Sequence, residues 1–406
     1  MKANVTITQH WRKWRLLILL NMTLLTNNTR GSIKGFTLIE LMVGIAISLV
    51  MLLVMGGVLA NANRQSSTTT SGADAQITGA IGAHIVERDL RMAGYGMNIA
   101  ALLGCEVYAY DKLSSGATAR YFIFSATPVT IVSGNTTVTS ANPFGLPDSL
   151  TITYGTSDVG LSATKLSAAS TGIDEANFKV SNRFGFHKGD VILLAGTTDA
   201  YSPDATTKQP TGGTNGITDC ALAQVTDVPT TSGLTDNIAH TSGSYTDASG
   251  NTAFARYNKP SGIGIPFTTS ATVYNMGPTP VSVTYGISNK AELTRLDNAD
   301  NGTAQPVAEN IVMLRAFYGK DTNADGAVDT WDQTTPTSGT LWKQVLAVQF
   351  AVVAQSVTKE SSVVTASPLT LWPNGPTVTL SSDQQKYRYK VFHSLVPLRN
   401  MIWSDS

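Results

Sequence analysis

One uninterrupted apolar segment constrains this chain more than any other feature of its sequence. It runs from Leu38 to Ala60 and contains a single ionisable side chain, that of Glu40. As a helix rising 1.5 Å per residue, the segment would be roughly 35 Å long, enough to cross a hydrocarbon core of about 30 Å. A secretory signal has an apolar core of only about 7–15 residues. The segment therefore predicts a retained membrane anchor.

The charges on either side of this segment predict its orientation. Residues 1–35 hold six Lys or Arg and no acid, so the formally neutral chain divides into a +6 leader and a −6 remainder. Lysine and arginine favour the cytoplasmic side of a membrane, so we expect a cytoplasmic N-terminus with the rest of the chain outside. The neutral total also argues against a chain that binds nucleic acid.

Glu40 is unusual because a carboxylate in a spanning helix costs a few kcal/mol unless it is hydrated or neutralised. Its position alone leaves open whether it is simply hydrated at the membrane surface. It follows the string Lys34-Gly35-Phe36-Thr37-Leu38-Ile39, which resembles the prepilin cleavage site of type IV pilins and type II secretion pseudopilins. The resemblance implies cleavage after Gly35 by a prepilin peptidase and methylation of Phe36. It also implies that Glu40 pairs with the terminal ammonium of Phe36 on a neighbouring subunit during assembly.

The leader is longer than leaders of that family usually are. Met22 offers an internal start that would give a leader of ordinary length. We therefore expect residues 1–21 to be an over-extended gene start, which N-terminal sequencing of the unprocessed form would test.

The sequence predicts four segments: the leader 1–35, a transmembrane and fibre-core helix 36–62, an amphipathic continuation of that helix 63–95, and a β-rich head 96–406. The continuation is predicted from Ile77, Ile81, Ile85 and Met92, whose near-helical spacing indicates an apolar stripe facing the head. A Ser/Thr run at 66–71 and Gly72 leave open whether the helix is unbroken.

The Gly94-Tyr95-Gly96 tripeptide predicts the end of this helix. Beyond it, short segments alternate polar with apolar residues, which favours antiparallel sheet with one buried face. The predicted fold is α+β and pilin-like: a long N-terminal helix packed on an antiparallel sheet head, with long loops at 197–216 and 230–264. The predicted strands are 121–124, 129–132, 150–154, 178–180, 190–194, 221–228, 273–276, 281–285, 292–296, 311–318, 345–353 and 389–396.

Two further segments narrow the resemblance. Residues 88–96 look like the segment that closes the first helix in minor pilins of the PilW type, and residues 389–400, ending in Leu-Arg-Asn, look like their terminal strand. Residues 189–194 and 219–225 are also similar to that family. The J-type pseudopilin of type II secretion is the nearest alternative.

Cys105 and Cys220 are the two cysteines of the chain. Both fall in the part expected outside the cytoplasm, where an oxidising compartment favours a disulfide. The alternative is two buried free thiols.

One loop has the spacing of a calcium site. Carboxylate or amide oxygens fall at positions 1, 3, 5, 9 and 12, glycine stands at position 6, and a backbone carbonyl is offered at position 7. The spacing favours calcium over an Asx-rich turn, although an aspartate replaces the usual glutamate at position 12 and no helices are expected to flank the loop. The residues concerned are Asp321, Asn323, Asp325, Ala327, Asp329 and Asp332.

No catalytic residues are predicted, because the five histidines are scattered and none of the common catalytic motifs occurs. The resemblance implies a minor pilin that is inserted in the bacterial inner membrane and then primes or caps type IV pilus assembly at the cell surface, near the tip. Its implied partners are other minor pilins, the major pilin, a tip adhesin, prepilin peptidase and the inner-membrane assembly platform, with adhesion and twitching motility as the processes served. A J-like pseudopilin is the alternative function, and a membrane-tethered periplasmic enzyme is a remote one. Calcium is the one cofactor considered.

Overall fold

The computed structural model describes residues 35–97, 102–134, 145–158, 163–171, 175–196, 201–203, 210–212, 219–230, 236–299 and 302–402. The chain forms two compact units, Met1–Gln65 and Ser66–Ser406, and each is described by itself. The expected internal start at Met22 lies outside the described residues.

Helix α2 runs unbroken from Leu38 to Met92 and is 55 residues long. Its N-terminal part is long and apolar enough to cross a membrane, and none of that apolar window is buried. The Ser/Thr run at 66–71 does not interrupt the helix. Gly94, with a φ of 77°, ends it by reversing the backbone, and the Tyr95 N–H bonds back to the Met92 carbonyl at 3.1 Å. The predicted stop is confirmed, three residues ahead of the expected boundary at 95.

The face that α2 turns toward the head is not the predicted one. Ile77, Ile81 and Met92 are 58 %, 48 % and 42 % exposed. The buried helix residues are instead mostly small: Ser71, Ala75, Gly79, Gly82, Val86, Asp89 and Leu90. Of the predicted stripe, Ile85 alone packs on the core, and it is half-buried. The prediction of an isoleucine stripe facing the head is therefore wrong.

The physical reason is the closeness of the helix to the sheets. A Cβ added to Gly79 would overlap the ring of Phe392, and one added to Gly82 would lie 3.1 Å from a methyl carbon of Leu293. Large side chains cannot occupy positions 79 and 82 at this close approach, and Ile77 and Ile81 lie exposed away from it.

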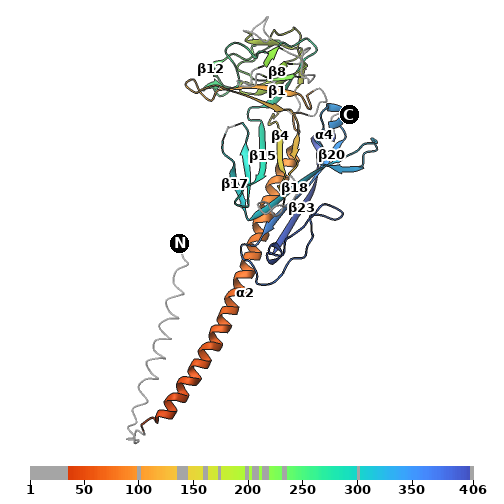
Figure 1. Ribbon diagram of the computed structural model, residues 1–406. Coiled ribbons are helices and arrows are strands. Elements are labelled where there is room, and N and C mark those ends of the chain that lie inside the picture. Colours follow the sequence, from red (N-terminus) through yellow and green to blue (C-terminus); the bar gives the residue numbers. More distant parts are fainter. Residues whose placement is uncertain are drawn as a thin grey trace, which may run out of the picture. The chain divides into compact units, whose positions relative to one another are not determined.

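Two antiparallel sheets share the helix-side core (Figure 1). One has the order β17-β16-β15-β4-β3 and the other the order β19-β18-β20-β23. Figure 1 shows β15 and β17 on one side of α2 and β18, β20 and β23 on the other. Their bounds are β3 Val129–Val132, β4 Ser149–Tyr154, β15 Val281–Ile287, β16 Glu292–Asp297, β17 Gln305–Glu309, β18 Ile311–Lys320, β19 Thr330–Asp332, β20 Val345–Gln355 and β23 Tyr389–Pro397.

A third sheet of six strands has the order β2-β1-β10-β7-β14-β5 and its own buried clusters. Its β1–β10 pair is parallel, whereas its other pairs are antiparallel. The chain enters this sheet twice, before β3 and again between β4 and β15. Its bounds are β1 Glu106–Asp111, β2 Arg120–Ser125, β5 Ala163–Lys165, β7 Val191–Ala195, β10 Asp219–Gln224 and β14 Thr272–Gly277.

The remaining elements are small. They are β6 Asn177–Lys179 with β11 Asn237–Ala239, β8 Tyr201–Pro203 with β9 Pro210–Gly212, β12 Gly243–Thr246 with β13 Thr252–Ala255, β21 Leu369–Thr370 with β22 Thr377–Val378, α3 Gly339–Trp342, η1 Gln384–Lys386 and α4 Arg399–Ile402.

The predicted α+β class, with a long helix and antiparallel sheets, is confirmed, and each predicted strand overlaps an observed one. The pairs β8–β9 and β12–β13 lie inside segments predicted as long loops. Strand β1 was not predicted, and neither was its parallel pairing with β10.

Candidate functional site

The start of α2 is held by a reciprocal pair of hydrogen bonds between Thr37 and Glu40. The Glu40 carboxylate accepts from the Thr37 N–H at 3.0 Å and from its hydroxyl at 2.9 Å, and the Glu40 N–H donates to the Thr37 hydroxyl oxygen at 3.3 Å. This is a capping box, which satisfies backbone donors that the first turn of a helix leaves free. The acid at this position therefore has a local role within one chain.

The predicted cleavage position is open. Phe36 is 86 % exposed, and a Cβ placed on Gly35 would meet no atom within 4 Å. Nothing in the described part of the chain requires glycine at 35 for space. A requirement for it would have to come from a processing enzyme.

The other end of α2 is held by the C-terminal segment. The Asn400 side-chain amide donates to the carbonyls of Met92 and Ala93, at 3.2 and 3.1 Å. These carbonyls lie at the helix end, where intrahelical partners run out. The structure thus brings together residues 88–96 and 389–400, whose contact their sequences did not predict.

A buried acid lies one turn before that helix end. Asp89 is 1 % exposed and accepts the Tyr285 hydroxyl at 2.6 Å, while Arg88 bonds its other oxygen at 3.1 Å and the Arg295 Nε lies 3.8 Å away. Burial, and then the hydrogen bond to Asp89 and the charge of that residue, raises the pKa of Tyr285 above its usual range. An acid is unfavourable near a helix C-terminus, and the two arginines compensate it. The arrangement fastens α2 to β15 and β16.

The predicted disulfide is present. Cys105 and Cys220 are bonded, with their Cα atoms 6.0 Å apart and a separation of 115 positions in sequence. Cys105 directly precedes β1, and Cys220 lies in β10 opposite Val107. The bond therefore fastens the parallel pair of the six-stranded sheet.

The predicted calcium loop is closed by its own hydrogen bonds. Asp321 accepts the N–H groups of Ala324 and Gly326, at 2.6 and 2.8 Å, and Asp329 accepts that of Thr322 at 2.7 Å. Asp332 lies in β19 and pairs with Lys320 at 2.7 Å.

Within the described residues, no group of three or more His, Cys, Asp or Glu side chains is placed to hold a metal ion. The geometry is that of an Asx-rich turn, and calcium stays a prediction from spacing.

The architecture defines a class: an α+β, pilin-like chain with a long N-terminal apolar helix followed by antiparallel sheets. Family models narrow the class. One described as the prokaryotic N-terminal methylation motif matches residues 30–56, and one described as type IV pilus-assembly protein W matches residues 282–400. Together they support a type IV pilus minor pilin of the PilW type. The comparisons with curated proteins and with solved structures find no match.

The matched regions divide the head. Residues 282–400 cover β15 to β23 and reach Asn400, so they include much of the surface that packs on α2. The six-stranded sheet lies outside them. The motif, followed by a long apolar helix, fits an inner-membrane-anchored pilin that is incorporated into pili. Both matches point to a structural protein. The likenesses predicted for 88–96, 189–194 and 219–225 lie outside the matched residues and stay predictions.

Proposed function

We propose that this chain is a prepilin, cleaved after Gly35 and methylated on Phe36, that enters type IV pili as a minor subunit and primes or caps their assembly near the tip. Its proposed partners are other minor pilins, the major pilin, a tip adhesin, prepilin peptidase and the inner-membrane assembly platform.

The observation that carries the proposal is one continuous helix with two different halves. Its first half follows the methylation motif and leaves its apolar side chains exposed, and its second half packs on sheets that match the PilW-type family. Exposed apolar side chains along half of a helix require a membrane or the packed core of a fibre around them.

Processing is tested by mass spectrometry of the chain from cells with and without prepilin peptidase. The mature form should begin with methylated Phe36 in the first strain and be missing in the second. A Gly35→Val chain should stay unprocessed, because the proposed peptidase would have to recognise glycine at this position. A Cβ at position 35 would meet no atom within 4 Å, so the change should leave the fold intact. A chain that begins at the same residue in both strains would contradict the proposal.

The pilus is distinguished from a secretion pseudopilus by deleting the gene. We expect the deletion to abolish surface pili and twitching and to leave protein secretion intact. Loss of secretion with normal pili would favour a J-like pseudopilin.

The position near the tip is argued from the size of the head. Residues 96–406 form a large head for a subunit that must pack side by side in a helical fibre, and the end of the fibre is less crowded. Immunogold labelling of sheared pili should place the chain at fibre ends, and labelling along the shaft would contradict this.

Calcium is tested by titrating the purified chain in a calorimeter. Heat of binding that disappears in Asp325→Ala, which removes the side-chain oxygens at position 5, would establish the loop as a calcium site, whereas no heat at millimolar calcium would leave it an Asx-rich turn.

A further inference from the structure

Strand β2 has an open edge. It ends the six-stranded sheet and pairs with β1 alone, from Arg120 to Ser125. The Ala126 N–H donates to the Cys105 carbonyl on the β1 side at 2.9 Å. Because inward and outward groups alternate along an antiparallel ladder, Tyr121, Ile123 and Ser125 direct their N–H groups to the outer side. Along the described backbone, the N–H and C=O groups of Tyr121 and Ile123 have no partner on that side.

A cavity of about 470 Å³ lies beside this edge. The half-buried rings of Phe122 and Phe124, stacked with centroids 5.8 Å apart, form one wall. The opposite wall is the face of the β3-β4-β15 sheet that points away from α2, and its hydroxyls bond one another, as in the 2.8 Å contact of Thr151 with Thr284. The cavity is thus apolar on the strand side and lined by hydroxyl and methyl groups on the other.

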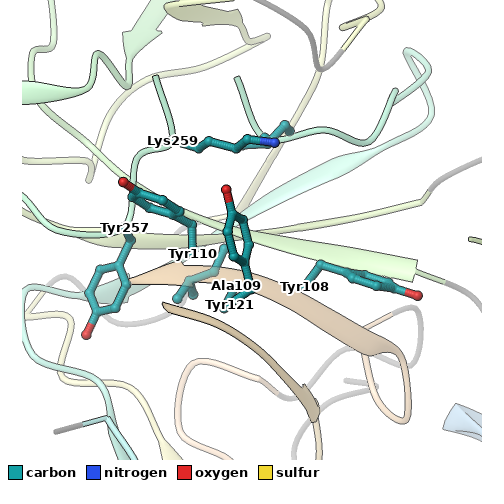
Figure 2. Close-up of a pocket in the computed structure, with 8 residues that line it drawn as sticks. Tyr108, Ala109, Tyr110, Tyr121, Tyr257 and Lys259 are labelled. Carbon is teal, nitrogen blue, oxygen red and sulfur yellow. The ribbon is translucent and has the colours of Figure 1, made fainter. Parts of the chain in front are cut away.

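Large aromatic side chains also lie on the other face of β2. Tyr121 meets Tyr110 edge to face, with ring centroids 5.4 Å apart, and the Lys259 ammonium lies 5.6 Å from the Tyr121 ring centroid. Figure 2 shows these three residues close together at one small pocket, which Tyr257 also lines. The open edge therefore has aromatic side chains on both of its faces.

We propose that the open edge of β2 and the cavity beside it bind an extended peptide segment of another protein by strand addition. Tyr121 and Ile123 offer main-chain donors and acceptors two residues apart, which an extended backbone matches. Alternate side chains of the added strand would enter the cavity against Phe122 and Phe124. Tyrosine and arginine, which surround this edge, are the residues that dominate protein–protein binding energy.

The charge of the cavity lining restricts which peptide segments would bind. Among the residues that the structure describes, Arg120 is the one charged residue that lines the cavity, and no acid does. Arg120 stacks 4.6 Å from the Phe122 ring centroid and bonds Asp111 at 2.8 Å. A segment with alternating apolar residues and neutral or acidic residues between them fits, whereas a basic segment does not. Strand β23 also ends a sheet, but it carries Lys390 and Pro397, residues with which natural edge strands resist pairing.

The test uses the full chain in detergent micelles and a phage-displayed library of random dodecapeptides. Selected peptides should alternate apolar residues, compete with one another, and slow deuterium exchange at the Tyr121 and Ile123 amides. Ser125→Pro removes an outward N–H at an exposed position and should weaken their binding about 3- to 10-fold, while Ser125→Ala keeps that N–H and should leave it unchanged.

A second variant tests the cavity. Phe122→Ala should weaken binding of the selected peptides at least about tenfold, as expected for a buried aromatic contact. Phe184→Ala is the matched control, since Phe184 is 80 % exposed and does not line the cavity. Thermal melting of each variant separates loss of binding from loss of fold.

Three results would overturn the proposal. One is a library that yields no binder, or binders indifferent to both Ser125→Pro and Phe122→Ala. The second is a dimer of the chain that Ser125→Pro dissociates, which would make a second copy the occupant. The third is an apolar dye that fills the cavity and is not displaced by the selected peptides, which would make it a small-molecule site.

Discussion

Glu40 has a role inside one chain and a proposed role between chains, and the two can be separated. Inside the chain its carboxylate caps α2 through Thr37. Between chains it is proposed to pair with the ammonium of Phe36, which needs a negative charge. A glutamine keeps the oxygen that a capping box needs and loses the charge.

We therefore expect Glu40→Gln to be processed normally and to be missing from sheared pili, like Glu40→Ala. Processing is measured by mass spectrometry and incorporation by immunoblot of the pilus fraction. Thr37→Val, which loses the hydroxyl but keeps the acid, is the control and should still be incorporated. Incorporation of the glutamine variant would show that capping is the role of this residue.

Asn400 secures the end of α2 through two carbonyl groups. We expect Asn400→Ala to lower the free energy of unfolding of the head by about 1–2 kcal/mol, because both contacts are lost at once. Thermal or denaturant unfolding measures the change. Arg399→Ala alters the exposed neighbour and should leave stability within about 0.5 kcal/mol of the parent. Equal losses in the two variants would contradict the cap.

His240 gives the head a pH dependence. Its ring is buried against Phe178, with centroids 3.9 Å apart, and burial lowers its pKa to about 4 despite the nearby Glu175 carboxylate. Between pH 6.5 and about 4 the imidazole of His240 is protonated in the unfolded chain but stays neutral in the folded one. The free energy of unfolding therefore falls as the pH falls through that window. The contribution of His240 to this loss of unfolding free energy should approach ~3 kcal/mol.

Denaturant unfolding at a series of pH values from 7 to 4 measures how steeply the free energy of unfolding falls with pH. His240→Leu should flatten it, whereas His393→Leu, at an exposed position, should not. An unchanged slope in His240→Leu would mean that other groups titrate.

At the scale of the element, two glycines of α2 should respond oppositely to the same change. A Cβ at Gly72 would have its nearest neighbour 4.0 Å away, whereas one at Gly79 would overlap Phe392. Alanine favours a helix over glycine by roughly 0.5–1 kcal/mol. We expect Gly72→Ala to stabilise the head by that amount and Gly79→Ala to destabilise it by about 1–3 kcal/mol. Thermal midpoints of the two variants make the comparison, and equal shifts would contradict the close packing.

The helix also shows where sequence reasoning succeeds and fails. Its start and its glycine stop follow from local patterns that the chain carries within a few residues, whereas its continuity through the Ser/Thr run at 66–71 was left open by the sequence. The orientation of the helix half that packs on the head does not follow from such patterns. A periodic run of isoleucines indicates that one face is apolar but does not indicate which face is buried. The distance between helix and sheet decides that, and Gly79 and Gly82 were the available signal.

At the scale of the whole molecule, the disulfide stabilises one part of the head in particular. The chain between Cys105 and Cys220 contains most of the six-stranded sheet and also β3 and β4. We expect the double variant Cys105→Ala, Cys220→Ala to lose up to about 4–5 kcal/mol in the chain-entropy description. Deuterium exchange should show the loss first in β1 and β10, with β18 and β20 still protected.

Reducing agent provides the control for this prediction. It should reproduce the loss in the parent chain and change nothing in the double variant. Uniform loss of protection across all three sheets would contradict a local role.

Much of the architecture could be predicted from the sequence, since strand alternation located most strands of the three main sheets, although not β1, and compartment alone paired the cysteines. The arrangement of strands could not be predicted, because the parallel contact of β1 with β10 joins segments more than a hundred residues apart. For the same reason the contact of Asn400 with the end of α2 could not be predicted, although both segments were singled out separately. In the calcium loop, spacing gave the positions of the oxygens but not their partners, such as Lys320 for Asp332.

The contact of Gly79 with Phe392 also limits how these two distant parts of the sequence can diverge. No amino acid is smaller than glycine, so every mutation at position 79 adds side-chain volume against Phe392. Only a smaller side chain at position 392 can remove the resulting overlap, for instance a leucine that leaves room for a methyl group on the helix. Among homologues, a larger residue at the position of Gly79 should therefore be accompanied by a smaller one at that of Phe392, as a compensatory pair.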